Sequence, residues 1–230
     1  MNGPRAGAAT PGGNDDALAG ELAAIEGGRL DVGPGDTARL IRHLCHSRKA
    51  LRRLAAGALG AAVRRGAIPP EVCERLLGSD DGQQRWGAAF ALSRAGRNSA
   101  AVVEVATTTL DSGDGDLRWA AASIVIGAAR ESAALRVRLR ELTESASATM
   151  RKMALLCLAE SGEREAAIYL RALDDPETLV RIAALTALSR AGIATDGVLE
   201  AIGQLAGADR AAAVRRVAAA IHRRLSTPSG

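Results

Sequence analysis

Six arginines recur along this chain at nearly constant spacing, and this repeat constrains the fold more than any other feature. Consecutive members lie 33, 33, 33, 30 and 34 residues apart: Arg52, Arg85, Arg118, Arg151, Arg181 and Arg215. Three residues after each arginine stands an alanine: Ala55, Ala88, Ala121, Ala154, Ala184 and Ala218. A fixed period of this length is typical of repeat architectures, in which each unit buries its apolar face against its neighbours.

The residues around each arginine predict one amphipathic helix per repeat. Apolar or small residues stand one position before the arginine and three, six and seven positions after it, which places them on one helix face. Gln84 and His222 are exceptions to this pattern. In the third repeat, Ala121 belongs to this core face, and Ala122 is expected off it. The small alanine column allows a partner helix to approach closely.

A second set of helices is expected between those that carry the arginines. Their predicted ranges are 37–46, 70–77, 99–110, 133–144, 164–173 and 197–205, with glycine and proline between them. The chain is therefore predicted to be all-α, a right-handed α-solenoid of about six helix-pair repeats over residues 36–225. Residues 1–16 are interpreted as a disordered leader, 17–35 as an N-terminal capping helix with a linker, and 226–230 as a disordered tail.

The best-preserved repeat shows what the unit resembles. Residues 174–188 contain an acidic turn followed by the pattern V-R-x-x-A-x-x-A-L. This pattern resembles the short HEAT-like repeats also found in phycobilisome-type lyases, and the resemblance covers roughly residues 36–225. It implies that the six arginines form a ladder with acids of the turns. It implies little about activity, because HEAT-like proteins range from scaffolds to enzymes.

The residues that directly follow the six repeat arginines form a second column, and this column is the main candidate for binding. It points about 200° away from the first core position, so its side chains are expected to face away from the partner helix. In HEAT-like proteins this side usually lines the concave surface, which implies a binding role here. Stacking of the repeats is expected to bring the two tryptophans side by side, with Phe90 one turn beyond Trp86. The candidate binding residues are Arg53, Trp86, Phe90, Trp119, Lys152 and Arg216. The alternative is that the tryptophans fill gaps between alanine-rich helices.

Charge is distributed unevenly along the sequence. Residues 36–66 contain eight Arg or Lys against one acid, residues 209–230 five against one, and residues 67–208 fifteen against nineteen. Basic ends favour an anionic partner such as nucleic acid, whose affinity for cations depends on salt. The alternative is that these arginines form solvated faces without a ligand.

Other features argue against catalysis and metal binding. The sequence has no Gly-rich phosphate loop, nucleophile elbow or HExxH motif. His43 and His46 share a helix face, but no further ligand is evident, and Cys45, Cys73 and Cys157 have no C-x-x-C spacing. No metal or cofactor is therefore expected. No run of residues has the length and apolarity of a membrane span, and a cytoplasmic protein is expected.

These observations favour a non-catalytic adaptor that binds a protein partner on the concave face, although an enzymatic activity is left open. One alternative is a nucleic-acid-binding protein with an architecture similar to HEAT-like DNA glycosylases. The other is a lyase or lyase chaperone similar to those that attach phycobilins.

Overall fold

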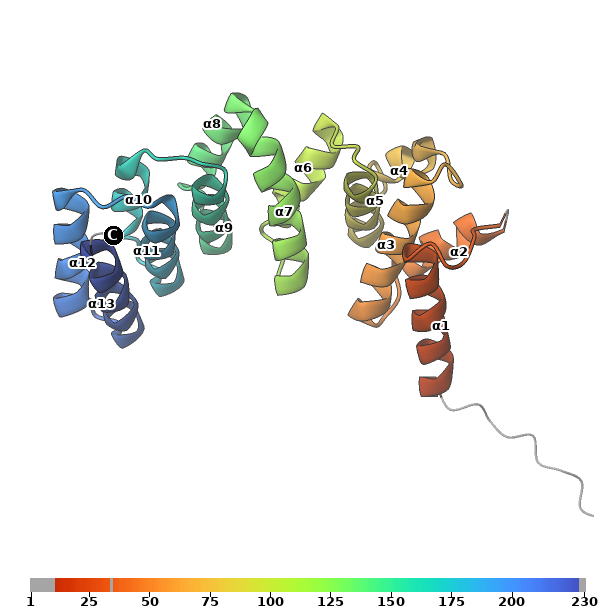
Figure 1. The fold of residues 1–230 in the computed structure, drawn as a ribbon, viewed down its shortest axis with the longest axis horizontal. Coiled ribbons are helices and arrows are strands. Elements are labelled where there is room, and N and C mark those ends of the chain that lie inside the picture. The colour runs from red at the N-terminus through yellow and green to blue at the C-terminus, as the bar shows by residue number, and fades with distance from the viewer. Residues whose placement is uncertain (1–10, 34, 228–230) are drawn as a thin grey trace, which may run out of the picture. The chain divides into compact units, whose positions relative to one another are not determined.

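The helix pairs expected from the repeat are present in the structure. The computed structural model describes residues 11–33 and 35–227, and every regular element in these ranges is a helix (Figure 1). The chain starts with α1 (Pro11–Glu26). The first helices of the pairs are α2 (Asp36–His43), α4 (Pro70–Leu76), α6 (Ala100–Thr109), α8 (Ala133–Leu142), α10 (Ala166–Ala172) and α12 (Asp196–Ala208). The second helices, which carry the repeat arginines, are α3 (Lys49–Arg64), α5 (Gly82–Arg94), α7 (Gly115–Glu131), α9 (Ala148–Glu160), α11 (Thr178–Ala191) and α13 (Ala212–Ser226).

The chain divides into two compact units, with the boundary inside α6 between Ala106 and Thr107. In the first unit, α1, α3 and α5 pack in chain order, while α2 covers α3 and α4 covers α5. In the second unit, α7, α9, α11 and α13 pack in chain order and form one layer (Figure 1). A second layer is formed by α8, α10 and α12, each packed against the following arginine-bearing helix. Each unit thus has a layer of first helices and a layer of second helices, as expected for an α-solenoid.

The alanine column lies at the centre of the packing between these helices. All six of its members are completely buried. The prediction for Ala122 was wrong, because this residue is buried as well as Ala121. Each helix that carries a repeat arginine packs against a neighbouring helix of the same kind as well as against other helices of its unit, so more than one of its faces is covered. A single amphipathic stripe therefore underestimates the buried surface of such a helix.

Glycines end four of the second helices, namely α3, α5, α9 and α11, and α1 ends in the same way. After α3, for example, Gly66 has a φ of 76°, and the next N–H, that of Ala67, bonds back to the carbonyl of Ala62. This 6→1 bond is the Schellman motif, which favours glycine because a side chain is strained at positive φ. Glycines with positive φ occupy this position at Gly28, Gly66, Gly96, Gly162 and Gly192. Because α1 ends like α3 and packs beside it, α1 resembles the second helices of the repeats.

The predicted termini differ from the structure at the N-terminal end. The expected leader over 1–16 is wrong for residues 11–16, which belong to α1, whereas residues 1–10 lie outside the described residues. The helix is held because Leu22 and Ile25 are buried where it packs against α3, and because Asp15 pairs with Arg48 at 3.1 Å. At the other end α13 reaches Ser226, and the part of the predicted tail over 228–230 lies outside the described residues.

Candidate interaction surface

All six repeat arginines hold the turn that precedes their own helix. In each case Nη1 donates to the backbone carbonyl six residues earlier, at 2.5–2.9 Å. The acceptors are the carbonyls of His46, Ser79, Ser112, Ser145, Asp175 and Asp209. Four of the arginines also donate to the next carbonyl along the turn. The arginine column therefore fixes the turn geometry in every repeat, whether or not an acid is nearby.

The side chain six residues before each arginine also caps the turn. In all six repeats it accepts a hydrogen bond from the backbone N–H two residues later, at 2.7–3.2 Å. The acceptor is the imidazole Nδ1 in His46, a hydroxyl oxygen in the three serines, and a carboxylate oxygen in the two aspartates. This capping column was not predicted from the sequence. Its signal is a polar residue at a constant distance of six before each arginine.

Two of the capping residues are acids, and these two also close the ladder between repeats. Arg151 donates from Nε and Nη2 to both carboxylate oxygens of Asp175, at 2.7 and 2.9 Å. Arg181 does the same with Asp209, at 2.8 and 3.0 Å. The hydrogen bond from Arg181 lowers the pKa of Asp209. Burial alone raises the pKa of Asp175, but the bonds from Arg151 and a backbone N–H outweigh burial, so this pKa also lies below its ordinary value.

The ladder is open at two earlier arginines. Ser145 occupies the capping position in the repeat after Arg118, and Ser79 occupies it in the repeat after Arg52, so neither position supplies a carboxylate. Within the described residues, Arg118 forms no ion pair and Nε of Arg52 is buried without a hydrogen-bond partner. In the second unit, the open link at Arg118 thus precedes two links that are closed by acids.

Trp86 lies in the interior and not on an exposed surface. Only 4% of its side chain is exposed, and its ring stacks on Phe90 with 5.3 Å between the ring centroids. Its indole Nε1 is buried without a hydrogen-bond partner among the described residues. Trp86 therefore matches the gap-filling alternative, and the expectation that Trp86 presents its ring to a ligand does not agree with this burial, whereas Phe90 is half-buried. The pairing of Trp86 with Trp119 remains a prediction, because the two residues belong to different units.

The other members of the predicted column remain accessible. Trp119 is 51% exposed, Arg53 and Arg216 are exposed, and Lys152 is half-buried. Burial lowers the pKa of Lys152, and the nearby charge of Arg118 lowers it further.

An exposed leucine that the sequence interpretation missed lies near this column. Leu179 is 62% exposed and stands one turn before Ile182, so both share a face of α11. Since α7, α9, α11 and α13 pack in order, equivalent positions on them form a row across the layer. We call this row the inner surface of the second unit, and it consists of Trp119, Lys152, Leu179, Ile182 and Arg216. It combines exposed apolar side chains with cations.

Comparison with known proteins identifies the repeat. The family model for HEAT repeats matches residues 103–189, a range that includes the Arg151–Asp175 link of the ladder. Residues 103–189 are HEAT repeats. No curated protein matches this HEAT-like chain in sequence.

Solved structures with the same kind of fold are distant in sequence. An engineered protein has 20% identity and a TM-score of 0.50, covering 83% of this chain and 96% of its own. The Escherichia coli protein YibA has 15% identity and a TM-score of 0.50, covering 93% of this chain and 83% of its own. A HEAT-like repeats protein from the archaeon Thermococcus onnurineus has 13% identity and a TM-score of 0.49, covering 96% and 98%. At such identities the likeness to the first two structures concerns the fold alone.

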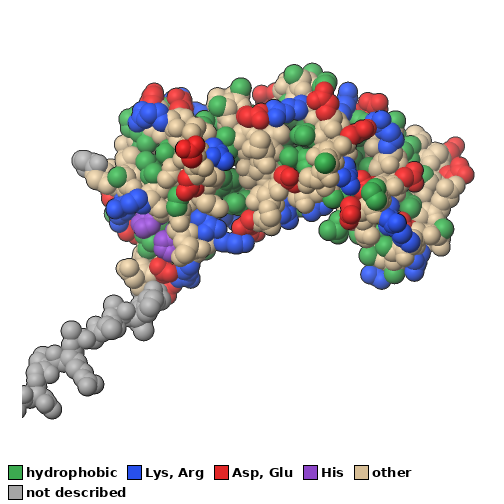
Figure 2. Space-filling model, turned by 180° about the vertical axis from the view of Figure 1, so that it is seen from behind, with side chains coloured by type: hydrophobic (Ala, Val, Ile, Leu, Met, Phe, Trp, Pro, Cys, Tyr) green, Lys and Arg blue, Asp and Glu red, His purple; other side chains and the backbone are tan. Residues whose placement is uncertain are grey.

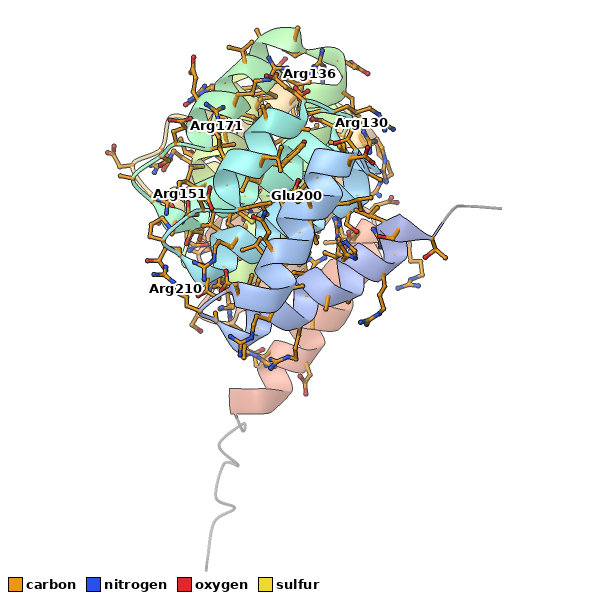
Figure 3. The ribbon with its side chains drawn as sticks, turned by 90° about the vertical axis from the view of Figure 1, so that its left-hand side faces the viewer. Arg130, Arg136, Arg151, Arg171, Glu200 and Arg210 are labelled. Carbon is orange, nitrogen blue, oxygen red and sulfur yellow. The ribbon has the colours of Figure 1, made fainter. Side chains whose placement is uncertain are left out.

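A second set of arginines lies at the opposite ends of the same helices of this HEAT-like protein. Arg130, near the end of α7, donates to the carbonyl of Glu160 at the end of α9, and Arg190 on α11 pairs with the Glu160 side chain. Arg224 on α13 donates to the carbonyl of Ser189 at 2.8 Å. Figure 3 shows Arg151 of the ladder at one edge of the second unit and Arg130 at the opposite edge. Basic residues in the last helix turn were the available sequence signal, and they also interact favourably with the helix dipole.

The two histidines of the first unit take part in the turn before α3. Their ring centroids lie 5.9 Å apart, and the histidine side chains seen in Figure 2 gather at one place. His46 caps the turn through Nδ1, while its Nε2 lies 3.6 Å from Asp15. In the part of the chain that the structure describes, no three metal-binding side chains cluster and no helix is long and apolar enough to cross a membrane.

Proposed function

We propose that this protein is a non-catalytic scaffold that binds a protein partner through the inner surface of the second unit. The observation that carries this proposal is the exposure of Trp119. The whole chain has four aromatic residues, and of these Trp86 and Tyr169 are buried. A tryptophan left half in solvent loses hydrophobic stabilisation, which binding to a partner would recover.

The surroundings of Trp119 support a protein ligand. Leu179 adds a second large exposed apolar side chain to the same surface, and Lys152 and Arg216 flank these residues with positive charge. An aromatic anchor with apolar neighbours and a charged rim is the composition expected of a protein interface.

The experiment compares two exposed apolar residues of equal accessibility on different helix layers. Trp119 on α7 is 51% exposed and Val137 on α8 is 49% exposed. The biotinylated full chain is used to capture partners from the lysate of its source cells, followed by cross-linking and mass spectrometry. We expect Trp119→Ser to lose a captured protein that Val137→Ser retains. If both variants capture the same proteins in the same amounts, the inner surface is not the binding site.

Nucleic acid is the second candidate, and one observation favours it. Arg216 and Arg223 lie seven residues apart on the exposed side of α13, and neither forms an ion pair within the described residues. The other basic segment is less available, since Arg39 pairs with Glu21 and Arg48 with Asp15. On the face seen in Figure 2, basic and acidic side chains are interspersed. Affinity for a labelled DNA duplex that falls steeply between about 50 and 200 mM salt would support this candidate.

A further inference from the structure

The link of the arginine ladder beside Trp119 differs from the two links that follow it. Asp175 and Asp209 each receive two hydrogen bonds from the arginine of the preceding repeat. Ser145 holds the equivalent position after Arg118, and its hydroxyl accepts only the N–H of Ser147 within its own turn. Arg118 therefore donates from Nη1 to the carbonyl of Ser112, and its Nε and Nη2 have no carboxylate partner among the described residues.

A second cation lies beside this open link. Lys152 stands on α9 at the position that follows the repeat arginine, and it is half-buried close to Arg118. Neither cation forms an ion pair with a carboxylate of the described residues. In the next link the equivalent position is the apolar Ile182, and the arginine of that link, Arg151, is paired with Asp175. Among Arg118, Arg151 and Arg181, Arg118 is the ladder arginine without a carboxylate partner within the described residues, and Lys152 adds a second unpaired cation beside it.

An exposed aromatic ring completes this arrangement. Trp119 follows Arg118 directly on α7 and occupies the same register position as Lys152 on the neighbouring α9. A guanidinium matches the geometry of a carboxylate with two parallel donors, and a half-buried ammonium gains from an opposite charge. The exposed indole of Trp119, one residue after Arg118, suits an apolar side chain next to the acid.

We propose that Arg118, Lys152 and Trp119 form a binding site for an aspartate or glutamate of the protein partner, whose carboxylate takes the place that Asp175 and Asp209 fill in the following links. This inference rests on the proposed function and names the chemistry of its partner: an acidic segment with an apolar residue beside the acid.

A protein carboxylate fits this place better than a nucleic acid backbone. Asp111 and Asp116 are exposed in the turn that leads into α7, close in sequence to Arg118 and Trp119. A nucleic acid backbone carries one negative charge per nucleotide, so a strand that extends past the site would be repelled by these acids. A single carboxylate needs only the space between the two cations.

The test uses Ser145→Asp, which supplies the missing carboxylate from within the chain. The probe is a fluorescein-labelled peptide of twelve residues that alternates glutamate and leucine, and binding to the full-length protein is followed by fluorescence anisotropy. We expect Ser145→Asp to raise the melting temperature, because it closes the link, and to weaken peptide binding about tenfold or more, because Arg118 is already occupied. Lys152→Gln should weaken binding by a similar factor without the rise in melting temperature.

Two controls separate charge at this site from charge in general. Ser145→Asn keeps a polar cap for the turn but adds no carboxylate, so it should bind the peptide as the unmodified protein does. Arg171→Gln removes an exposed cation on α10, which pairs with Glu144 and with no other acid of the described residues, and it too should leave binding unchanged.

Several results would overturn the proposal. The first is that Ser145→Asp binds the peptide as tightly as the unmodified protein does, and the second is that a peptide with glutamine in place of glutamate binds equally well. The third is that a twelve-nucleotide single-stranded DNA competes at a lower concentration than the peptide. The fourth is that no binding is detected up to about 1 mM peptide. The proposed function is tested separately by Trp119→Ser. If that variant loses the natural partner while Ser145→Asp keeps it, the surface stands and the carboxylate site is wrong.

Discussion

Arg181 and Asp209 form a buried bidentate ion pair between consecutive repeats. Nε and Nη2 of Arg181 donate to the two carboxylate oxygens of Asp209 at 2.8 and 3.0 Å, and both side chains are only 4% exposed. The remaining Nη1 of Arg181 donates to the carbonyl of Asp175, and Asp209 accepts the N–H of Ala211. One charge pair thus connects two turns and holds each of them in shape.

Removing the acid of this pair should be costly. Asp209→Ala leaves the charge of Arg181 buried without a partner, and we expect a loss of about 3–5 kcal/mol in the free energy of unfolding. The control is Glu144→Ala, whose partner Arg171 is 68% exposed, and for which about 0–1 kcal/mol is expected. Urea denaturation of the three proteins measures both effects. Equal losses in the two variants would show that the Arg181–Asp209 pair does not stabilise the fold.

The same pair should make stability depend on acid pH. Hydrogen bonding lowers the pKa of Asp209 in the folded protein, so the unfolded chain takes up the proton first as pH falls. Its contribution is complete above the unfolded pKa of about 3.9 and disappears as pH falls through the folded pKa. The stability difference between the unmodified protein and Asp209→Asn should therefore be constant from pH 7 to 5 and shrink below about pH 4. Urea denaturation at pH 7, 5, 4 and 3 checks this, and a difference that is the same at pH 3 contradicts it.

Two helical glycines should respond in opposite directions to alanine. A Cβ on Gly60 of α3 would lie 2.7 Å from the carbonyl oxygen of Ala91 and 2.9 Å from Cβ of Arg94, so the backbones of α3 and α5 would have to move apart. We expect Gly60→Ala to destabilise by about 1–3 kcal/mol. Gly127 of α7 has open space at the same point, so Gly127→Ala should stabilise by up to about 1 kcal/mol through helix propensity. A stabilising Gly60→Ala would mean that the close approach of α3 and α5 is not required.

Replacing the two tryptophans by alanine should affect the stability of the fold differently. Trp86 is buried against Phe90, and we expect Trp86→Ala to cost about 3–5 kcal/mol of stability. Trp119→Ala removes an exposed ring and should change stability by no more than about 0.5 kcal/mol. Thermal unfolding of both variants followed by circular dichroism separates the two cases. A loss for Trp119→Ala as large as that for Trp86→Ala would place Trp119 in the core and remove it from the candidate surface.

The sequence alone determined the helix pairs and the position of the arginine column. Both follow from signals that lie within a single repeat. An apolar pattern with a 3.6-residue period predicts each helix, and glycines mark where helices end. The fully buried alanine column and the helix bounds, which agree within a few residues, illustrate this.

Only the tertiary structure decided which members of a register column are exposed and which arginines have acids. Trp86 and Trp119 occupy equivalent positions, yet Trp86 is 4% exposed and Trp119 is 51% exposed. Likewise Arg118, Arg151 and Arg181 share one pattern, but the turn of the next repeat supplies a carboxylate to Arg151 and Arg181 and a serine, Ser145, to the link at Arg118. Exposure and ion pairing depend on atoms contributed by segments distant in sequence, and a single helix pattern contains no information about them.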